Sequence, residues 1–511
     1  MQITSSVPWW KHSVCYQIYV RSFADGNGDG IGDMRGIEQR LPYLADLGVD
    51  SVWITPFYTS PQHDHGYDVA DYRDVDPLFG TLADFDSMLA KAHELGIKVI
   101  VDVVPNHTSH EHEWFEAALA AAPGSPERER FIFRDGKGRD GSKPPNNWKS
   151  IFGGPAWTRV EDGQWYLHLF DTSQPDLNWW NPEVGDEFES ILRFWLDRGV
   201  DGFRIDVAHG LYNPEHLPDR KRHEKLPAPM WDQPEVHEVY RRWRTILEEY
   251  DGDRMAVAEA WTDSPESMAR YIRSDELQQA FNFHWLSAPW SAAAFRRVVQ
   301  ESLHAVSLVD ATATWVLSNH DVVRHTTRYG GGAVGLARAR AAVMTMMALP
   351  GSAYVYQGEE LGLEQVDVPP HHREDPAFHR SEGEHEGRDG CRVPMPWSGE
   401  HPPFGFGPGD GQPWLPQPRS WVHCTVEAQE DDPTSTLSFY RELLALRRDA
   451  AAGLPHVLTP VTSAPGTLAF RRGQGADALV CVVNCGSRAA RVPAEAGEVL
   501  MTSGADLVEG S

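Results

Sequence analysis

An arginine and an aspartate stand two residues apart in the apolar segment 202–209. Side chains two apart on a strand share a face, so the guanidinium of Arg204 is expected beside the carboxylate of Asp206. A neighbouring cation favours the ionised acid, and an ionised acid at a strand end can attack an electrophile. Taken alone, such a pair is more often a structural ion pair than a catalytic one.

Other apolar segments also end in acids or histidines. Glu259 directly follows the segment 255–258, and His320 and Asp321 come shortly after the segment 311–317. This recurrence favours chemistry over a purely structural role, provided that the fold brings these segment ends together.

Amphipathic helices alternate with the apolar segments. A helical stripe of apolar residues begins at Ile37 and ends before Gly48, and a strand is expected at 49–54. The same order recurs along more than half of the chain and, with a short strand expected at 281–283, eight strands can be counted. This pattern predicts a (β/α)8 barrel, in which functional residues gather at the carboxyl ends of the strands.

Two regions interrupt the alternation of helices and strands, and a third region follows it. Residues 107–170 are too long for a strand-to-helix loop and predict a small inserted domain after the third strand. Residues 366–432 predict a long loop over the last strand. Short alternating segments then predict an antiparallel β domain at 454–511, which leaves 1–106 and 171–450 for the barrel. His107, His110 and His112 open the insertion, where individual hydrogen bonding is favoured over zinc.

Oxygen-bearing side chains alternate with glycine at 25–33. This spacing is what a hard cation such as Ca²⁺ or Mg²⁺ requires. The alternative is a glycine-rich turn held by Asx hydrogen bonds. We expect a structural ion, remote from catalysis, and the predicted metal residues are Asp25, Asn27, Asp29, Ile31 and Asp33.

The composition excludes several partners. Lys and Arg number 46 against 74 Asp and Glu, so the net charge of -28 opposes binding to nucleic acid and to anionic membranes. The five cysteines are too few and odd in number for a disulfide framework, which favours reduced thiols. No apolar stretch reaches about 18 residues, so a soluble, cytoplasmic protein is expected, with its oligomeric state open.

Five ordered segments resemble the signatures of glycoside hydrolase family 13, the α-amylase family. They are residues 102–107, 174–178, 202–209, 258–261 and 318–321. The resemblance implies that Asp206 is the nucleophile, Glu259 the general acid/base and Asp321 the acid that holds sugar hydroxyls. Glycoside cleavage with retention requires one ionised and one protonated carboxyl group, which agrees with these roles.

Within the family, the chain is similar to the oligo-1,6-glucosidase and α-glucosidase branch. Residues 64–68 and 388–397 resemble that branch's pocket motifs. The resemblance implies that Arg388 and Asp64 close the pocket and that Tyr67 stacks on glucose. His107, His320 and Arg204 complete the predicted substrate-binding set.

The implied activity is that of a retaining, exo-acting α-glucosidase on short, maltose-type α-glucosides, with no organic cofactor. An oligo-1,6-glucosidase or an α-transglucosylase would use the same residues. Linkage preference stays open, because by resemblance Val207 favours α-1,6 linkages whereas Ala208-His209 is similar to α-glucosidases that act on maltose-like substrates. A non-catalytic binding relative is opposed by the intact acids. An open-cleft endo-enzyme is opposed by Asp64 and Arg388.

Overall fold

Eight parallel strands form the centre of the fold, in the order β11-β10-β9-β5-β2-β1-β13-β12. They are β1 (Val14–Ile18), β2 (Ser51–Ile54), β5 (Lys98–Val103), β9 (Gly202–Ile205), β10 (Met255–Ala258), β11 (Gln279–Ala280), β12 (Thr314–Val316) and β13 (Ser352–Tyr356). A parallel bridge between Phe281 and Thr314 joins the two edges of this sheet. The computed structural model describes residues 7–221, 228–409, 411–451, 453–491 and 497–504, and the predicted barrel is confirmed.

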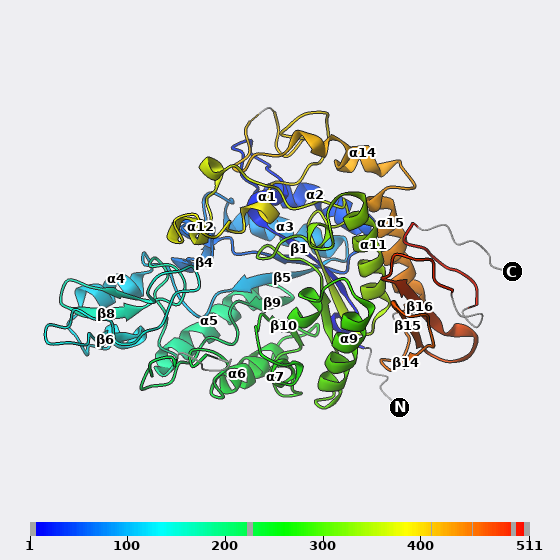
Figure 1. Ribbon diagram of the computed structural model, residues 1–511. Helices are drawn as coiled ribbons and strands as arrows, with labels where there is room; N and C mark the ends of the chain where they lie inside the picture. Colours follow the sequence, from blue (N-terminus) through cyan, green and yellow to red (C-terminus); the bar gives the residue numbers. More distant parts are fainter. Residues whose placement is uncertain (1–6, 222–227, 410, 452, 492–496, 505–511) are drawn as a thin grey trace.

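The longer helices lie around the outside of the barrel (Figure 1). They are α2 (Met34–Leu47), α3 (Leu82–Glu94), α5 (Pro182–Arg198), α6 (Val236–Glu248), α9 (Ala292–Ser307), α11 (Gly332–Ala348) and α15 (Thr436–Leu446), which continues into a π-helical turn at Arg447–Ala451. Shorter helices are α1 (Val20–Phe23), α4 (Glu113–Ala120), α7 (Pro265–Arg270), α8 (Phe283–Leu286), α10 (His325–Arg328), α12 (Pro376–Arg380), α13 (Asp389–Arg392) and α14 (Val426–Glu430).

Capping residues fix where these helices begin and end. Thr81 and Asp84 form a reciprocal capping box at the start of α3. Gly48 follows α2 in a left-handed conformation with φ 90°, which a glycine adopts without strain. Each helix therefore stops where the chain must turn into the next strand.

One predicted strand is wrong in its position. The strand expected at 281–283 lies earlier, as β11, and only Phe281 adds a bridge to it. Asn282 instead accepts a hydrogen bond from the N–H of Trp285 and caps α8, which begins at Phe283. The capping side chain is the physical reason that strand gives way to helix at this point.

Two three-stranded sheets lie outside the barrel among the described residues. In the insertion, β6 (Phe133–Asp135), β8 (Gln164–Leu167) and β7 (Trp157–Arg159) form an antiparallel sheet, which projects from one side in Figure 1. Near the C-terminus, β14 (Leu458–Pro460), β15 (Thr467–Arg472) and β16 (Leu479–Asn484) form another. The inserted and C-terminal β elements of the predicted fold class are confirmed, and the domain boundaries stay predictions.

A short hairpin of β3 (Tyr58–Thr59) and β4 (Asp71–Val75) carries the loop that contains Asp64 and Tyr67.

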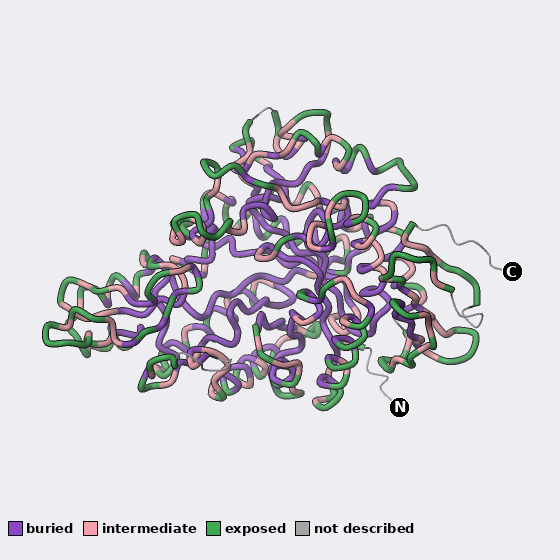
Figure 2. Tube along the Cα trace, in the orientation of Figure 1, coloured by how far each residue is buried: buried purple, intermediate pink, exposed green. Residues whose placement is uncertain are grey.

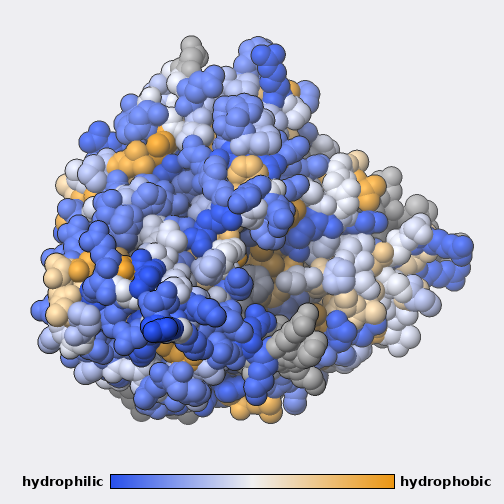
Figure 3. Space-filling view, turned by 60° about the vertical axis from the view of Figure 1, so that its left-hand side comes forward, coloured by the Kyte–Doolittle hydropathy of each residue, from blue (hydrophilic) through white to orange (hydrophobic). Residues whose placement is uncertain are grey.

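The barrel interior and its helix contacts are buried, and the loops of the insertion and C-terminal part are more exposed (Figure 2). On the face shown in Figure 3, hydrophilic residues predominate and hydrophobic ones lie in scattered patches. None of the described helices is long and apolar enough to cross a membrane.

Candidate active site

The predicted acids meet at the carboxyl ends of neighbouring strands. Asp206 follows β9 and Glu259 follows β10, and these two strands pair in register. Asp321 lies beyond the end of β12. Parallel strands place their carboxyl ends at the same rim, so residues far apart in the sequence come together there.

Arg204 is the centre of this group. Its Nη1 lies 2.6 Å from Asp206 Oδ1 and 3.0 Å from Asp102 Oδ1, and its Nη2 lies 2.7 Å from Glu259 Oε2. The arginine is 1% exposed, so the ion pairs lie where water screens them little. A single guanidinium thereby fixes the positions of three carboxylates.

The proton balance belongs to the whole cluster. Burial raises the pKa of Asp206 well above its usual range, and Glu259 and Asp102 add to that effect while Arg204 opposes it. Burial also raises the pKa of Asp102 to about 7. Since one cation faces three carboxylates, burial and mutual repulsion favour a proton shared within the cluster, and the expectation that Arg204 keeps Asp206 ionised is incomplete.

Glu259 is held on both of its oxygens. Oε2 accepts a hydrogen bond from the N–H of Val207 at 3.0 Å, and Oε1 accepts one from Trp261 Nε1 at 3.1 Å. Val207 has φ 44°, an uncommon conformation for a β-branched residue. The strained residue next to Asp206 thus aims its backbone N–H at the second acid, as is typical of functional sites.

Asp321 has a different electrostatic environment. Arg392 lies 3.0 Å from its Oδ1, Arg388 lies 3.2 Å from the same atom, and His320 Nε2 lies 3.3 Å from its Oδ2. Although burial opposes it, these neighbours lower the pKa of Asp321 far below its usual range. Asp321 is therefore the ionised acid of the group.

His320 connects Asp321 to the aromatic residues of the site. Burial lowers the pKa of His320 well below its usual value, so the ring is neutral. Its Nδ1 lies 2.7 Å from the amide of Gln17 and its Nε2 lies 2.7 Å from the hydroxyl of Tyr67. The rings of Tyr67 and His320 stack at 5.3 Å, which holds the phenol beside Asp102.

Arg388 and Asp64, the pair predicted to close the pocket, are in direct contact. Arg388 Nη2 lies 2.7 Å from Asp64 Oδ1, and the same arginine pairs with Asp375 at 2.7 Å. Burial raises the pKa of Asp64 to about 6, and Arg388 opposes that rise. The amide of Gln174 lies 3.1 Å from both Asp64 Oδ2 and His107 Nε2. Burial also lowers the pKa of His107 to about 3, so it is a neutral partner.

All nine predicted catalytic and substrate-binding residues are thus brought into one connected group. Sequence reasoning gave no role to four residues that hold it together, namely Asp102, Gln174, Asp375 and Arg392. Three of them stand inside the recognised segments and could have been found there. Asp375 stands in the long loop 366–432, where no spacing pointed to it.

The predicted metal loop lies apart from this group. Its side-chain oxygens already accept backbone hydrogen bonds: Asp25 from Gly28 and Gly30, and Asp33 from Gly26 and Gly36, with Asp33 also capping α2. Asp25, Asn27 and Asp29 also each accept from the N–H two residues on, and these bonds are the Asx turns of the alternative interpretation. They leave lone pairs on carboxylate and amide oxygens, so the donor set remains chemically suited to a hard cation.

A family model described as alpha amylase, catalytic domain, matches residues 17–453. The chain belongs to the α-amylase family. This confirms the resemblance drawn from the five segments, and the chain is accordingly a glycoside hydrolase.

Relatives in the α-amylase family match nearly the whole chain. A probable alpha-glucosidase from Rhizobium meliloti is 39% identical over 508 residues, which cover 94% of this chain and 90% of the relative. An oligo-1,6-glucosidase from Parageobacillus thermoglucosidasius is 37% identical over 479 residues, covering 86% and 84%. The crystal structure of an alpha-glucosyl transfer enzyme gives a TM-score of 0.87 at 39% identity, covering 94% of this chain and 92% of that one.

Proposed function

We propose that the protein is a retaining, exo-acting α-glucosidase that releases glucose from the non-reducing end of short α-glucosides. The observation that carries this proposal is the pairing of Asp206 and Glu259 with the same buried arginine, opposite an ionised Asp321. Relatives named alpha-glucosidase and oligo-1,6-glucosidase support it.

In the first step, the carboxylate of Asp206 attacks the anomeric carbon and displaces the leaving-group oxygen, to which Glu259 gives its proton. This requires the shared proton to be on Glu259, which leaves Asp206 as the anion that Arg204 stabilises. Glu259 Oε1 is free of the ion pair and is the oxygen suited to donate. In the second step, Glu259 takes a proton from water, whose oxygen attacks the anomeric carbon and displaces the carboxylate of Asp206, so that glucose leaves with the α configuration.

Asp321, Asp64 and Arg388 position the glucosyl unit in this proposal. Their charges suit the hydroxyl groups of a terminal sugar, and neutral His107 and His320 add hydrogen bonds without net charge. In this proposal the Arg388–Asp64 pair blocks the path of a longer chain, and their direct ion pair at 2.7 Å supports exo attack.

Transfer to a sugar acceptor is the second candidate function. Trp261 is 43% exposed and stacks on Phe283 with ring centroids 3.9 Å apart, directly beside Glu259. Such an exposed aromatic surface suits an acceptor sugar. The structural similarity to an alpha-glucosyl transfer enzyme supports this candidate, and an α-1,6 preference remains the alternative within hydrolysis.

A substrate panel tests the proposal. Maltose, isomaltose, sucrose, trehalose, kojibiose and nigerose would be incubated separately, and the anomers formed would be followed by proton NMR from the first minutes. We expect α-glucose from maltose as the first product. Release of β-glucose, or of internal fragments from longer maltooligosaccharides, would refute retention or exo attack respectively.

We further propose that residues 25–33 hold a structural Ca²⁺ or Mg²⁺ ion through Asp25, Asn27, Asp29, Asp33 and the carbonyl group of Ile31. The burial of Asp25 and Asp33 and the alternating oxygen donors support it. A cytoplasmic location is also proposed, supported by the five free thiols, since such thiols persist in reducing compartments.

A further inference from the structure

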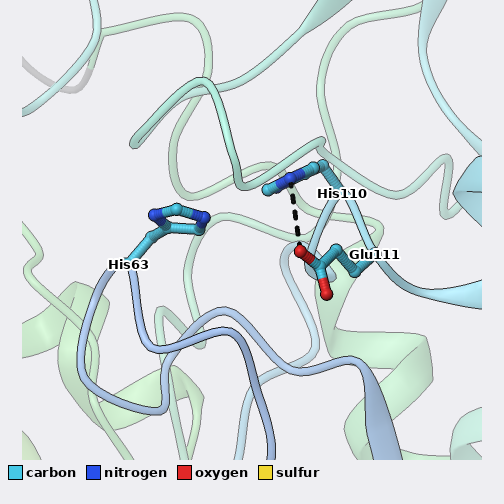
Figure 4. Close-up of side chains that lie close together, drawn as sticks. All are labelled: His63, His110 and Glu111. Atoms are coloured by element: carbon cyan, nitrogen blue, oxygen red, sulfur yellow. Dashed lines mark ion pairs between the residues drawn. The ribbon is translucent and has the colours of Figure 1, made fainter.

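Two imidazoles and a carboxylate from separate segments meet beside the candidate active site. They are His63, in the loop between β3 and β4, and the adjacent residues His110 and Glu111, in the segment that follows β5. One ligand atom from each lies within 4.8 Å of the other two. Figure 4 shows the His63 ring facing His110 from a different loop, with the Glu111 carboxylate next to them.

Within the part of the chain that the structure describes, no hydrogen bond occupies the side chains of this group. The rings of His63 and His110 lie 5.2 Å apart, and His110 Nε2 lies 3.9 Å from Glu111 Oε1, which is longer than a hydrogen bond. Nδ1 of His110 is buried without a hydrogen-bond partner among the described residues. The other two histidines of the segment differ, because His107 bonds with Gln174 and His112 caps α4.

We propose that His63, His110 and Glu111 form a binding site for a divalent transition-metal ion, of which Zn²⁺ is the representative. Two imidazole nitrogens and one carboxylate oxygen are ligands that Zn²⁺ prefers, whereas Ca²⁺ and Mg²⁺ prefer oxygen alone. Three protein ligands leave the fourth tetrahedral position to water.

The geometry requires only a small contraction. Ligand atoms about 2.1 Å from a tetrahedral ion lie about 3.4 Å from one another. Since His63 and Glu111 are exposed, their side chains can rotate to reach this spacing without moving the backbone. The bound ion would join two loops that also carry site residues, because Asp64 follows His63 and His107 stands three residues before His110.

Equilibrium dialysis of the full chain against Zn²⁺, with metal analysis, tests the site. Saturating Ca²⁺ would be present throughout to occupy the loop at 25–33. We expect one strongly bound Zn²⁺ per chain, a higher midpoint of thermal unfolding, and a cobalt absorption spectrum of low coordination number when Co²⁺ replaces it. His63→Ala and His110→Ala should each weaken Zn²⁺ binding at least about tenfold, since each removes one of three ligands.

The matched control is His371→Ala/His372→Ala, which removes two adjacent exposed imidazoles whose rings lie 4.3 Å apart. This variant should bind Zn²⁺ as the unchanged protein does. Glu111→Gln, a substitution of equal size at an exposed position, keeps the test valid if a histidine variant fails to fold. Unchanged Zn²⁺ affinity in the His63, His110 and Glu111 variants, or loss of binding only in the control, would overturn the proposal.

Discussion

Nη2 of Arg388 lies 2.7 Å from Oδ1 of Asp64, although 324 positions separate the two residues in the chain. The same guanidinium also contacts Asp375 and Asp321. A planar group with five donors can serve three carboxylates at once, which a lysine ammonium cannot do in this geometry. The link among Asp64, Asp321 and Asp375 therefore depends on this particular side chain.

Arg388→Lys should open the end of the pocket that we propose Arg388 and Asp64 to close. We expect KM for maltose to rise about tenfold or more, equivalent to about 1.4 kcal/mol of lost binding, while maltotetraose gains relative to maltose in kcat/KM. Steady-state kinetics on both substrates measure this. Arg373→Lys, in the same loop, is the control and should leave the ratio unchanged. If the ratio of kcat/KM for maltotetraose to that for maltose is unchanged in Arg388→Lys, the Arg388–Asp64 pair does not limit substrate length.

Asp206→Asn should abolish turnover without unfolding the protein. The amide cannot form the ester to glucose, so we expect kcat to fall by about 10⁴-fold or more. Removing one of three carboxylates around Arg204 also relieves repulsion, so thermal stability should be unchanged or higher. The exposed Asp251→Asn serves as control. Normal activity in Asp206→Asn would refute its role as nucleophile.

Trp261→Phe should separate the hydrogen bond that the Trp261 indole donates to Glu259 from the aromatic surface that it offers to an acceptor sugar. The variant keeps an aromatic surface on Phe283 but removes the N–H that donates to Glu259 Oε1. Loss of one such hydrogen bond, about 1 kcal/mol, should lower kcat about fivefold and shift the pH profile. Trp261→Ala should in addition lower the ratio of transfer to hydrolysis at high maltose. An unchanged ratio in Trp261→Ala would exclude the acceptor surface.

Asp176→Asn should change how stability depends on pH. Burial raises the pKa of Asp176 to about 8, above its unfolded value of 3.8, and its Oδ2 has no hydrogen-bond partner among the residues that the structure describes. The folded state thus holds a proton that the unfolded chain releases, so this residue's contribution to stability is lost as pH rises from about 4 to about 8.

The slope of that loss is about 1.4 kcal/mol per pH unit for one group. Between pH 5 and pH 8, the free energy of unfolding should therefore fall more steeply in the unchanged protein than in Asp176→Asn. Urea unfolding at several pH values measures the difference. Parallel curves for the two proteins would mean that Asp176 is ionised in the folded state.

Chelation should destabilise the protein if the loop at 25–33 holds an ion. We expect EGTA or EDTA to lower the midpoint of thermal unfolding and added Ca²⁺ or Mg²⁺ to restore it. Asp29→Ala should remove this response, and the exposed Asp251→Ala should keep it. If neither chelator nor cation changes the midpoint of thermal unfolding, the Asx turns alone explain the sequence pattern of this loop.

Local patterns in the sequence predicted the barrel and placed acids at its strand ends, whereas the roles of these acids and the pocket residues Asp64 and Arg388 were implied by the family resemblance. Apolar segments ending in acids set the strand ends, and parallel pairing then required those ends to share a rim. The short strand β11 was misplaced because an Asn282 cap, which competes with strand pairing, leaves no mark on hydrophobic periodicity.

Other features depend on contacts that only the folded chain makes. Asp375 reaches Arg388 from a loop without periodic pattern. The shared proton around Arg204 depends on the distances of three carboxylates, and His63 meets His110 across two loops. The spacing of residues within one sequence segment carries no information on contacts between distant segments.

The position of β1 between β2 and β13 has a consequence for synthesis on the ribosome. One edge of β1 has no neighbouring strand until β13 (Ser352–Tyr356) has left the exit tunnel. Arg388, the ion-pair partner of Asp64, is synthesised later still. A nascent chain would thus carry an open sheet edge and an unpaired Asp64 through most of translation. Chaperone protection of that edge, or late and concerted collapse, is what such a connectivity demands.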